Sequence, residues 1–264
     1  MAKEMLNKIE NALHEHIVST SKRERSERVK GMEHMFSASS TGYCYLNQWF
    51  KISNPELAVA PEAKSQRIMR LGTLIHEDFE KALGNAFGGD ECLVEGDIHL
   101  PELNLRGSFD AAFRIDSTTA AVVDFKSIGS FGYKLQFGRD AMKKGKTTIK
   151  RGHALQLGIY AHGIKEEWEY ETVLMYLVYY NKDTSMLRIR EIPQSYIDEA
   201  VEYWEDVNEI LEIENGHTKI ENLDMALERM TPEIDLGVPM ENWQCSYCDF
   251  YNSCPSTLSK KKRK

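Results

Sequence analysis

The chain has 264 residues, 42% of them hydrophobic, with 33 basic and 41 acidic side chains and a formal net charge of −8. This composition is typical of a globular protein and excludes collagen-like and disordered chains, and no stretch has the roughly eighteen uncharged apolar residues of a membrane span. The net acidity argues against coating nucleic acid through bulk charge, although a local basic groove stays compatible with it. The first residues, MAKEMLNKIENALHEH, lack an apolar signal core, so we expect a cytoplasmic protein.

The N-terminal third is expected to be helical. Residues 3–18 place apolar side chains on one helix face, and a short helix is expected to carry Cys44 and Trp49, with hydroxyl residues at 37–41 available as caps. A longer helix over residues 62–84 contains His76 and ends near Gly88 and Gly89.

The period then changes to that of strands. Strands are expected at 93–99, 104–115 and 120–127, followed by a glycine- and lysine-rich loop or short helix at 129–152, a helix at 153–166, strands at 172–180 and 186–192, and a helix at 194–214. After residue 231 the chain reads as irregular. The order predicts a mixed α/β (α+β) core, with a central mixed sheet flanked by helices. We divide it into a helical region 1–61, a core 62–214 and a C-terminal cysteine module with a basic tail, 215–264.

Two aspartates are expected to face each other in this sheet. If the hairpin closes through an odd-numbered loop centred on Ser117, Asp110 lies opposite Asp124, with Cβ atoms ~5 Å apart. Facing carboxylates repel, and a hard divalent cation, Mg²⁺ or Mn²⁺, is the natural ion between them. Lys126 shares the face of Asp124 and is placed to position a water or stabilise phosphate charge. The alternative is a pair of strand-end residues with a solvated lysine, since D-x-K is a common tripeptide.

Three further polar residues lie on predicted helices. His76 follows Gly72 by four residues, and an imidazole is a possible metal ligand. Gln156 and Tyr160 are four residues apart and share a helix face. Each also has an ordinary reading, as a satisfied histidine, an incidental glutamine and a core tyrosine.

In chain order these residues form the series G-x-x-x-H, G-x-x-D, D-x-K and Q-x-x-x-Y, which resembles the PD-(D/E)XK nuclease superfamily, in particular its RecB-like exonuclease branch. The resemblance covers about residues 70–180 and implies a restriction-endonuclease-like core. The chain departs from the pattern in two places: Asp124 stands where Glu is frequent, and Phe109 precedes Asp110 where Pro is usual.

The resemblance also implies roles. The metal ligands would be His76, Asp110, Asp124 and the backbone carbonyl of Phe125, and Lys126 would be the catalytic lysine. Gln156 and Tyr160 would support the site and contact the nucleic acid.

Three cysteines near the end of the chain, Cys245, Cys248 and Cys254, have the spacing C-x2-C-x5-C, which indicates a metal site. A tetrahedral site needs a fourth ligand, for which Cys44 and Cys92 are the candidates, and we expect Cys92 to be a buried thiol. The pattern resembles the iron–sulfur subgroup of these nucleases, which includes CRISPR-associated RecB-like exonucleases and AddB-type subunits. That resemblance implies a 4Fe–4S cluster on Cys44 and the three C-terminal cysteines, with zinc as the alternative.

A basic segment, residues 139–151, separates the D-x-K strand from the Q-x-x-x-Y helix. Its Lys143, Lys144, Lys146 and Lys150 are candidates for gripping a phosphate backbone, although a solvated charged loop is the ordinary reading. The sequence therefore predicts a Mg²⁺- or Mn²⁺-dependent DNA exonuclease that acts on single strands or free ends, with 5′-to-3′ action favoured and no membrane partner. The alternative is a non-catalytic DNA-end-binding or assembly subunit of a CRISPR-adaptation or recombination complex.

Overall fold

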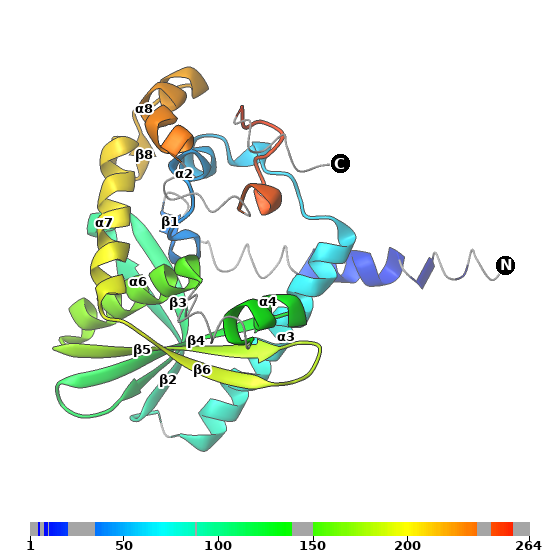
Figure 1. The fold of residues 1–264 in the computed structure, drawn as a ribbon, viewed down its shortest axis with the longest axis vertical. Helices are drawn as coiled ribbons and strands as arrows, with labels where there is room; N and C mark the ends of the chain where they lie inside the picture. The colour runs from blue at the N-terminus through cyan, green and yellow to red at the C-terminus, as the bar shows by residue number, and fades with distance from the viewer. Residues whose placement is uncertain are drawn as a thin grey trace.

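The computed structural model describes residues 5, 8–9, 11–20, 35–87, 89–138, 150–236 and 244–255. Within them a six-stranded mixed sheet lies between helix α3 on one face and helix α6 on the other, and α7 packs against α6 (Figure 1). The strands are β1 (Phe36–Ser37), β2 (Cys92–Leu100), β3 (Leu105–Arg114), β4 (Thr119–Ile128), β5 (Thr172–Asn181) and β6 (Leu187–Ile192).

The helices are α2 (Tyr45–Ser53), α3 (Ala63–Ala86), α4 (Ser130–Phe137), α6 (Arg151–Trp168), α7 (Ser195–Ile210) and α8 (Leu223–Leu236). Short 3-10 turns lie at η1 (Ala38–Ser40), η2 (Pro55–Leu57), η3 (Pro101–Leu103) and η4 (Gln244–Tyr247), and a small hairpin joins β7 (Ile213–Glu214) to β8 (His217–Thr218). The predicted mixed α/β class with a central sheet flanked by helices is confirmed.

The sheet follows the order β1-β3-β4-β5-β6, and β2 pairs with the other edge of β3. The pairs β1–β3 and β4–β5 are parallel, and the remaining pairs are antiparallel. One edge of β3 is shared, because Leu105 and Arg106 pair with β1 whereas Ala111 to Arg114 pair with β4. Residues 107–110 of β3 therefore lie between these two ladders, where β3 and β4 separate.

The hairpin register agrees with the expected loop. Ala111 pairs with Val123 and Arg114 with Ala120, so the turn is centred on Ser117. Asp116 closes the turn, since its Oδ1 accepts hydrogen bonds from the backbone N–H groups of Thr118 and Thr119. This side-chain cap fixes the register that places the ends of β3 and β4.

One hydrophobic core joins the three segments into which the sequence was divided. Its buried members include Trp49 on α2, Leu155 and Ile159 on α6, Trp204 on α7 and Phe250 near the C-terminal cysteines. Trp204 and Tyr203 are buried, and Tyr196 is partly buried against the same core. Among the described residues, no helix is both long and apolar enough to span a membrane.

Several local predictions were wrong. Cys44 lies just before α2 instead of inside it, because the hydroxyl residues expected to cap that helix form the η1 turn, where Thr41 Oγ1 donates to the Ala38 carbonyl. The helix predicted to reach residue 214 ends at Ile210, where the β7–β8 hairpin follows. The region after residue 231 continues α8 to Leu236, and the buried Ala226 and Met230 explain why that helix forms.

Candidate functional site

Asp110 and Asp124 lie at the point where β3 and β4 separate. Their last paired neighbours are Ala111 and Val123, so the two aspartates occupy the next opposed positions. The Phe125 backbone N–H donates to Asp110 Oδ2 at 2.5 Å. The carboxylate therefore takes the place of the backbone carbonyl that would accept this hydrogen bond in a paired strand. The predicted convergence of two carboxylates is therefore present in the geometry.

Asp124 is the more deeply buried of the pair, with 2% of its surface exposed. Burial, together with the charge of Asp110, raises its pKa to about 6, although Lys126 and His76 act in the opposite direction. Lys126 Nζ lies 2.7 Å from Asp124 Oδ2, so the ammonium is the partner of this buried oxygen. A buried carboxylate oxygen that already faces a positive charge is a suitable ligand for a cation.

A chain of hydrogen bonds joins the lysine to α6. Lys126 Nζ donates to Gln156 Oε1 at 2.8 Å, and Gln156 Nε2 donates to the Tyr160 hydroxyl at 2.8 Å. Tyr160 is buried, and burial raises the pKa of its hydroxyl well above the ordinary value. Gly107 makes room for it, because a Cβ at that position would lie 2.8 Å from Tyr160 Cε1. Gly107 of the G-x-x-D motif and Tyr160 of the Q-x-x-x-Y motif therefore meet in space.

His76 reaches the carboxylate pair from α3. Its Nδ1 lies 3.6 Å from Asp110 Oδ1, and its ring is edge-on to Phe125. Phe125 stacks on Phe79 of α3, whereas Lys126 bonds to α6, so successive residues of β4 face opposite layers as expected. Gly72 lets α3 lie close to the Ser127 hydroxyl, which is 3.1 Å from a Cβ built at that position.

These side chains fit a hard divalent cation by their chemistry: two carboxylates, an imidazole and a nearby backbone carbonyl are oxygen and nitrogen donors. Within the described part of the chain, however, no group of three or more His, Cys, Asp or Glu side chains is arranged to hold a metal ion as it stands. Lys126 now occupies the position beside Asp124 Oδ2.

The four predicted cluster cysteines come from both ends of the described chain. Cys44, Cys248 and Cys254 pack against the shared core, and all the cysteines are free thiols. Burial, together with the nearby Cys248, Cys254 and Cys245, raises the pKa of Cys44 to about 12. Asn47 Nδ2 donates to Cys248 Sγ at 3.3 Å. Cys92 is buried elsewhere, on β2, as expected.

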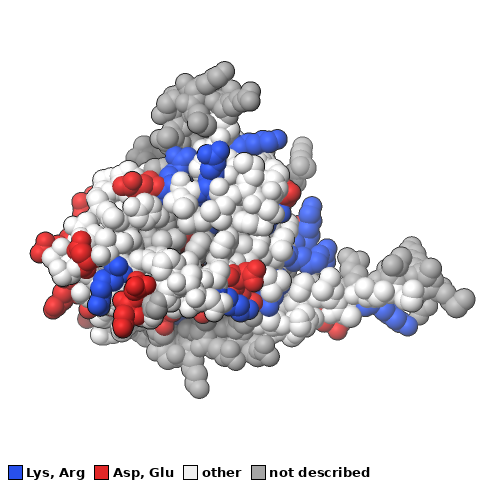
Figure 2. Space-filling view, turned by 90° about the horizontal axis from the view of Figure 1, so that it is seen from below, with Lys and Arg blue, Asp and Glu red and all other residues white. Residues whose placement is uncertain are grey.

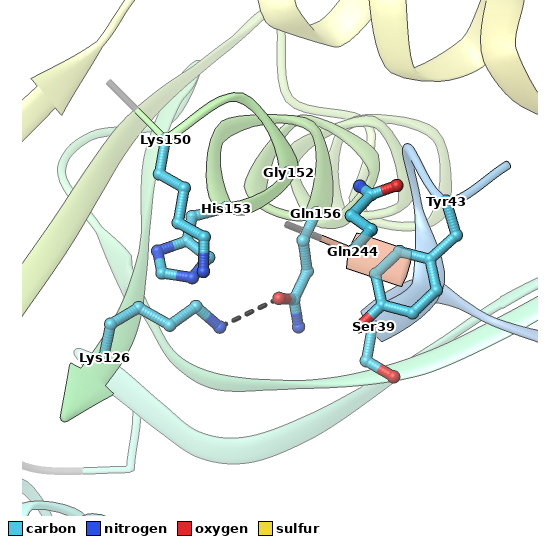
Figure 3. A pocket seen from close by; sticks show the side chains of 8 residues that line it. All are labelled: Ser39, Tyr43, Lys126, Lys150, Gly152, His153, Gln156 and Gln244. Carbon is cyan, nitrogen blue, oxygen red and sulfur yellow. Dashed lines mark hydrogen bonds between the residues drawn. The ribbon is translucent and has the colours of Figure 1, made fainter. Parts of the chain in front are cut away.

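A pocket borders this site, and we call it the Lys150 pocket (Figure 3). One side consists of Lys126 and Gln156 together with Lys150, Gly152 and His153 from the start of α6. Of the predicted basic residues, Lys150 thus lies beside Lys126, while Lys143, Lys144 and Lys146 fall outside the described residues.

The opposite side of the Lys150 pocket consists of Ser39, Tyr43 and Gln244. Sequence reasoning missed these three residues and His153. Only adjacency hinted at them: Tyr43 directly precedes Cys44, and Gln244 directly precedes Cys245. Figure 2 shows acidic and basic side chains both present on the face seen from below, so a single sign of charge does not cover that face. Binding of an anion would thus rely on local groups.

Comparison with known proteins was made for sequence and for fold. The chain matches the PD-(D/E)XK nuclease superfamily over residues 11–255. No curated protein sequence matches significantly. The solved structure of SSO0001 is similar in fold, with a TM-score of 0.54 at 20% identity, covering 92% of this chain and 96% of that chain.

Two solved structures of an alkaline exonuclease, LHK-Exo from Laribacter hongkongensis, are more distant. The first has a TM-score of 0.41 at 12% identity, and its complex with dAMP has a TM-score of 0.43 at 13% identity. Both comparisons cover 81% of this chain and 98% of the other.

Proposed function

The chain belongs to the PD-(D/E)XK nuclease superfamily, and from this premise we propose that it is a divalent-metal-dependent deoxyribonuclease with Asp110, Asp124 and Lys126 at its centre. The observation that carries the proposal is the meeting of two carboxylates and a lysine where β3 and β4 separate. A protein that only binds DNA does not need two carboxylates that face each other, since these repel each other and the phosphate backbone.

Nucleases of this superfamily generally use Mg²⁺ or Mn²⁺. The residues that would hold the ion are Asp110, Asp124, His76 and the Phe125 carbonyl. When bound, the ion would act as a Lewis acid on the phosphodiester and lower the pKa of a bound water. The raised pKa of the buried Asp124 carboxyl supports this assignment, because a divalent cation would offset both its burial and the nearby charge of Asp110.

Lys126 has the role of a positioned cation. Gln156 holds its ammonium within reach of the carboxylate pair, and Tyr160 in turn fixes Gln156. In this position the ammonium orients a water for in-line attack and stabilises negative charge that develops on the phosphate. Gln156 and Tyr160 act through Lys126, so they are positioning residues.

We further propose that Cys44, Cys245, Cys248 and Cys254 hold a 4Fe–4S cluster. The mutual influence of their charges on the pKa of Cys44 supports their proximity, and the shared core brings both chain ends together. A cluster there would close a loop of about two hundred residues and so constrain the unfolded chain. Zinc is the alternative occupant, and the visible spectrum of anaerobically purified protein distinguishes the two.

The finer activity that we propose is exonuclease action on single-stranded DNA from a free end, with 5′-to-3′ direction favoured, in a CRISPR or recombination setting. This proposal extends the motif resemblance. It is tested with DNA substrates that differ in whether they have a free end and in which end is labelled. Strands labelled at the 5′ or 3′ end should be shortened from one end, while a circular single strand should survive.

The test of the proposed function is digestion of labelled single-stranded DNA with Mn²⁺. Asp124→Ala should abolish digestion, and chelation with EDTA should do the same for the wild type. Asp90→Ala, which removes an exposed carboxylate before β2, is the matched control and should digest normally. Equal digestion by Asp124→Ala and the wild type would reject the proposed site.

A further inference from the structure

The Lys150 pocket shares Lys126 and Gln156 with the proposed catalytic site, but its other residues have no role in that chemistry. No carboxylate lines the pocket among the described residues, whereas Lys126, Lys150 and His153 all face it. Figure 3 shows these three nitrogen-bearing side chains gathered on one side, with Gln244, Tyr43 and Ser39 across from them. The chain as a whole has a net charge of −8, so this local group of basic side chains stands out, and it favours binding of an anion.

The start of α6 contributes backbone groups to the same side. The first hydrogen bonds of this 18-residue helix run from His153 N and Ala154 N to the Lys150 carbonyl. The N–H of Gly152 precedes these bonds. Apart from its chain neighbours and its own helix backbone, no heavy atom of the described residues lies within 4 Å of the place where a Gly152 Cβ would stand. The helix start is therefore open toward the pocket, and its dipole favours negative charge.

His153 faces the pocket as a neutral ring. Burial, together with the charges of Lys126 and Lys150, holds the pKa of His153 well below its ordinary value. Its Nδ1 lies 3.2 Å from the Tyr179 hydroxyl, which leaves Nε2 as the ring nitrogen for a ligand. The crowding of two ammonium groups around this ring would be relieved by an anion between them.

The opposite wall consists of two segments that are far apart in the sequence, around residues 39–43 and at residue 244. Gln244 Nε2 donates to the Gly42 carbonyl at 3.0 Å, and Gly42 adopts φ +81°, a conformation that favours glycine. Tyr43 and Gln244 are each followed by a cysteine of the proposed cluster. The cysteine module thus positions one wall of the pocket.

We propose that the Lys150 pocket is a subsite for a second, uncleaved phosphate of the bound strand, adjacent to the phosphodiester at the carboxylate pair. The proposal rests on the proposed nuclease function, since it takes the ligand to be a nucleic-acid strand. Lys126 stands between the two phosphates. Lys150, Gly152 and His153 bind the uncleaved one, and the wall of Tyr43 and Gln244 limits how the strand enters.

The test uses Gly152→Asp, which places a carboxylate in the open space at the start of α6. An acidic residue in the first turn of a helix favours the helix, so the fold should be kept or stabilised. Binding of a fluorescent single-stranded oligonucleotide without divalent metal, measured by anisotropy, should weaken about tenfold or more, as expected when a charge-assisted contact is lost. Gly152→Asn controls for size. Gly89→Asp adds the same charge in the turn before β2, where space is also open, and should bind as the wild type does.

Oligonucleotides with a single uncharged methylphosphonate linkage locate the subsite. For the wild type, one linkage next to the cleaved position should weaken binding most. For Gly152→Asp, the same uncharged linkage should weaken binding little or improve it, because the introduced carboxylate then meets no charge. Gly152→Asp binding as tightly as Gly89→Asp, or equal responses of both proteins to every linkage, would overturn the subsite. A wild type that binds in this pattern but never cleaves would instead reject the nuclease proposal and leave the subsite standing.

Discussion

The Lys126 ammonium lies 2.7 Å from the buried carboxylate of Asp124 and also donates a hydrogen bond to Gln156 on α6. One cation therefore connects the end of β4 to the helix layer above it. The pair does not neutralise the cost of burying Asp124, because burial outweighs the lysine and the pKa of the carboxyl stays raised, at about 6. We therefore expect the metal-free protein to be less stable than a variant with hydrophobic residues at these positions. Such a cost is common where residues are selected for function.

The first prediction concerns the stability of the metal-free protein. The Asp124 pKa rises from 3.8 to about 6 on folding, so this group costs stability as pH increases from about 4 to 6, and the cost stays constant above that. Asp124→Asn removes the charge and should raise the unfolding free energy at pH 7 by roughly 1–3 kcal/mol. Thermal unfolding in EDTA at pH 7 and pH 4.5 measures it, and the gain should shrink at the lower pH.

Asp90→Asn is the control, because its carboxylate is exposed, and its effect should be small at both pH values. Addition of Mn²⁺ should stabilise the wild type and not Asp124→Asn, since only the wild type keeps both carboxylates. An Asp124→Asn variant that is less stable than the wild type at pH 7 would mean that the Lys126 contact outweighs burial.

The second prediction concerns the positioning of Lys126. Tyr160→Phe keeps the buried ring but removes the hydroxyl that accepts the Gln156 Nε2 hydrogen bond, so Gln156 should hold Lys126 less firmly. We expect kcat to fall several-fold with little change in KM, and the unfolding free energy to fall by about 1 kcal/mol. Tyr180→Phe removes an exposed hydroxyl on β5 and should leave kcat unchanged. A change confined to KM would argue that Tyr160 acts on substrate binding instead.

The β3–β4 hairpin and helix α6, which carry most of the motif residues, could be predicted from the sequence because each depends on residues that are close along the chain. An odd-numbered turn at Ser117 fixes which residues of β3 and β4 are opposed, and a four-residue spacing puts Gln156 beside Tyr160. The Lys150 pocket could not be read in this way. Ser39, Tyr43 and Gln244 meet Lys126 only because the shared core folds both chain ends onto α6, and short-range spacing carries no information on that.

The third prediction concerns the cysteine module. Burial holds the Cys44 pKa at about 12, so the thiolate that a metal requires forms only as the metal binds. Anaerobically purified protein should be brown, and Cys44→Ser should lose the visible absorbance and much of its thermal stability. Cys92→Ser removes a buried thiol on β2 and should keep the colour. Colourless wild-type protein that contains zinc would overturn the iron–sulfur proposal.

The last prediction concerns how α6 is held over the sheet, since this helix carries Gln156 and His153. A Cβ at Gly158 would lie 2.2 Å from the Tyr196 carbonyl oxygen, a backbone atom that cannot move aside, so Gly158→Ala should force α6 away from α7. Gly163→Ala would meet Cγ2 and Cβ of Ile98 at 2.7 and 2.9 Å, a less severe overlap than the one at Gly158. Gly84→Ala, with open space on α3, should stabilise the helix by about 0.5–1 kcal/mol.

Thermal unfolding should therefore rank Gly84→Ala above the wild type, then Gly163→Ala, then Gly158→Ala, with the last losing roughly 1–3 kcal/mol. Nuclease activity at a temperature where all four proteins are folded should fall only for Gly158→Ala, because a displaced α6 carries Gln156 away from Lys126. Full activity in a strongly destabilised Gly158→Ala would show that Lys126 keeps its position without α6, and Gln156 would then lose its positioning role.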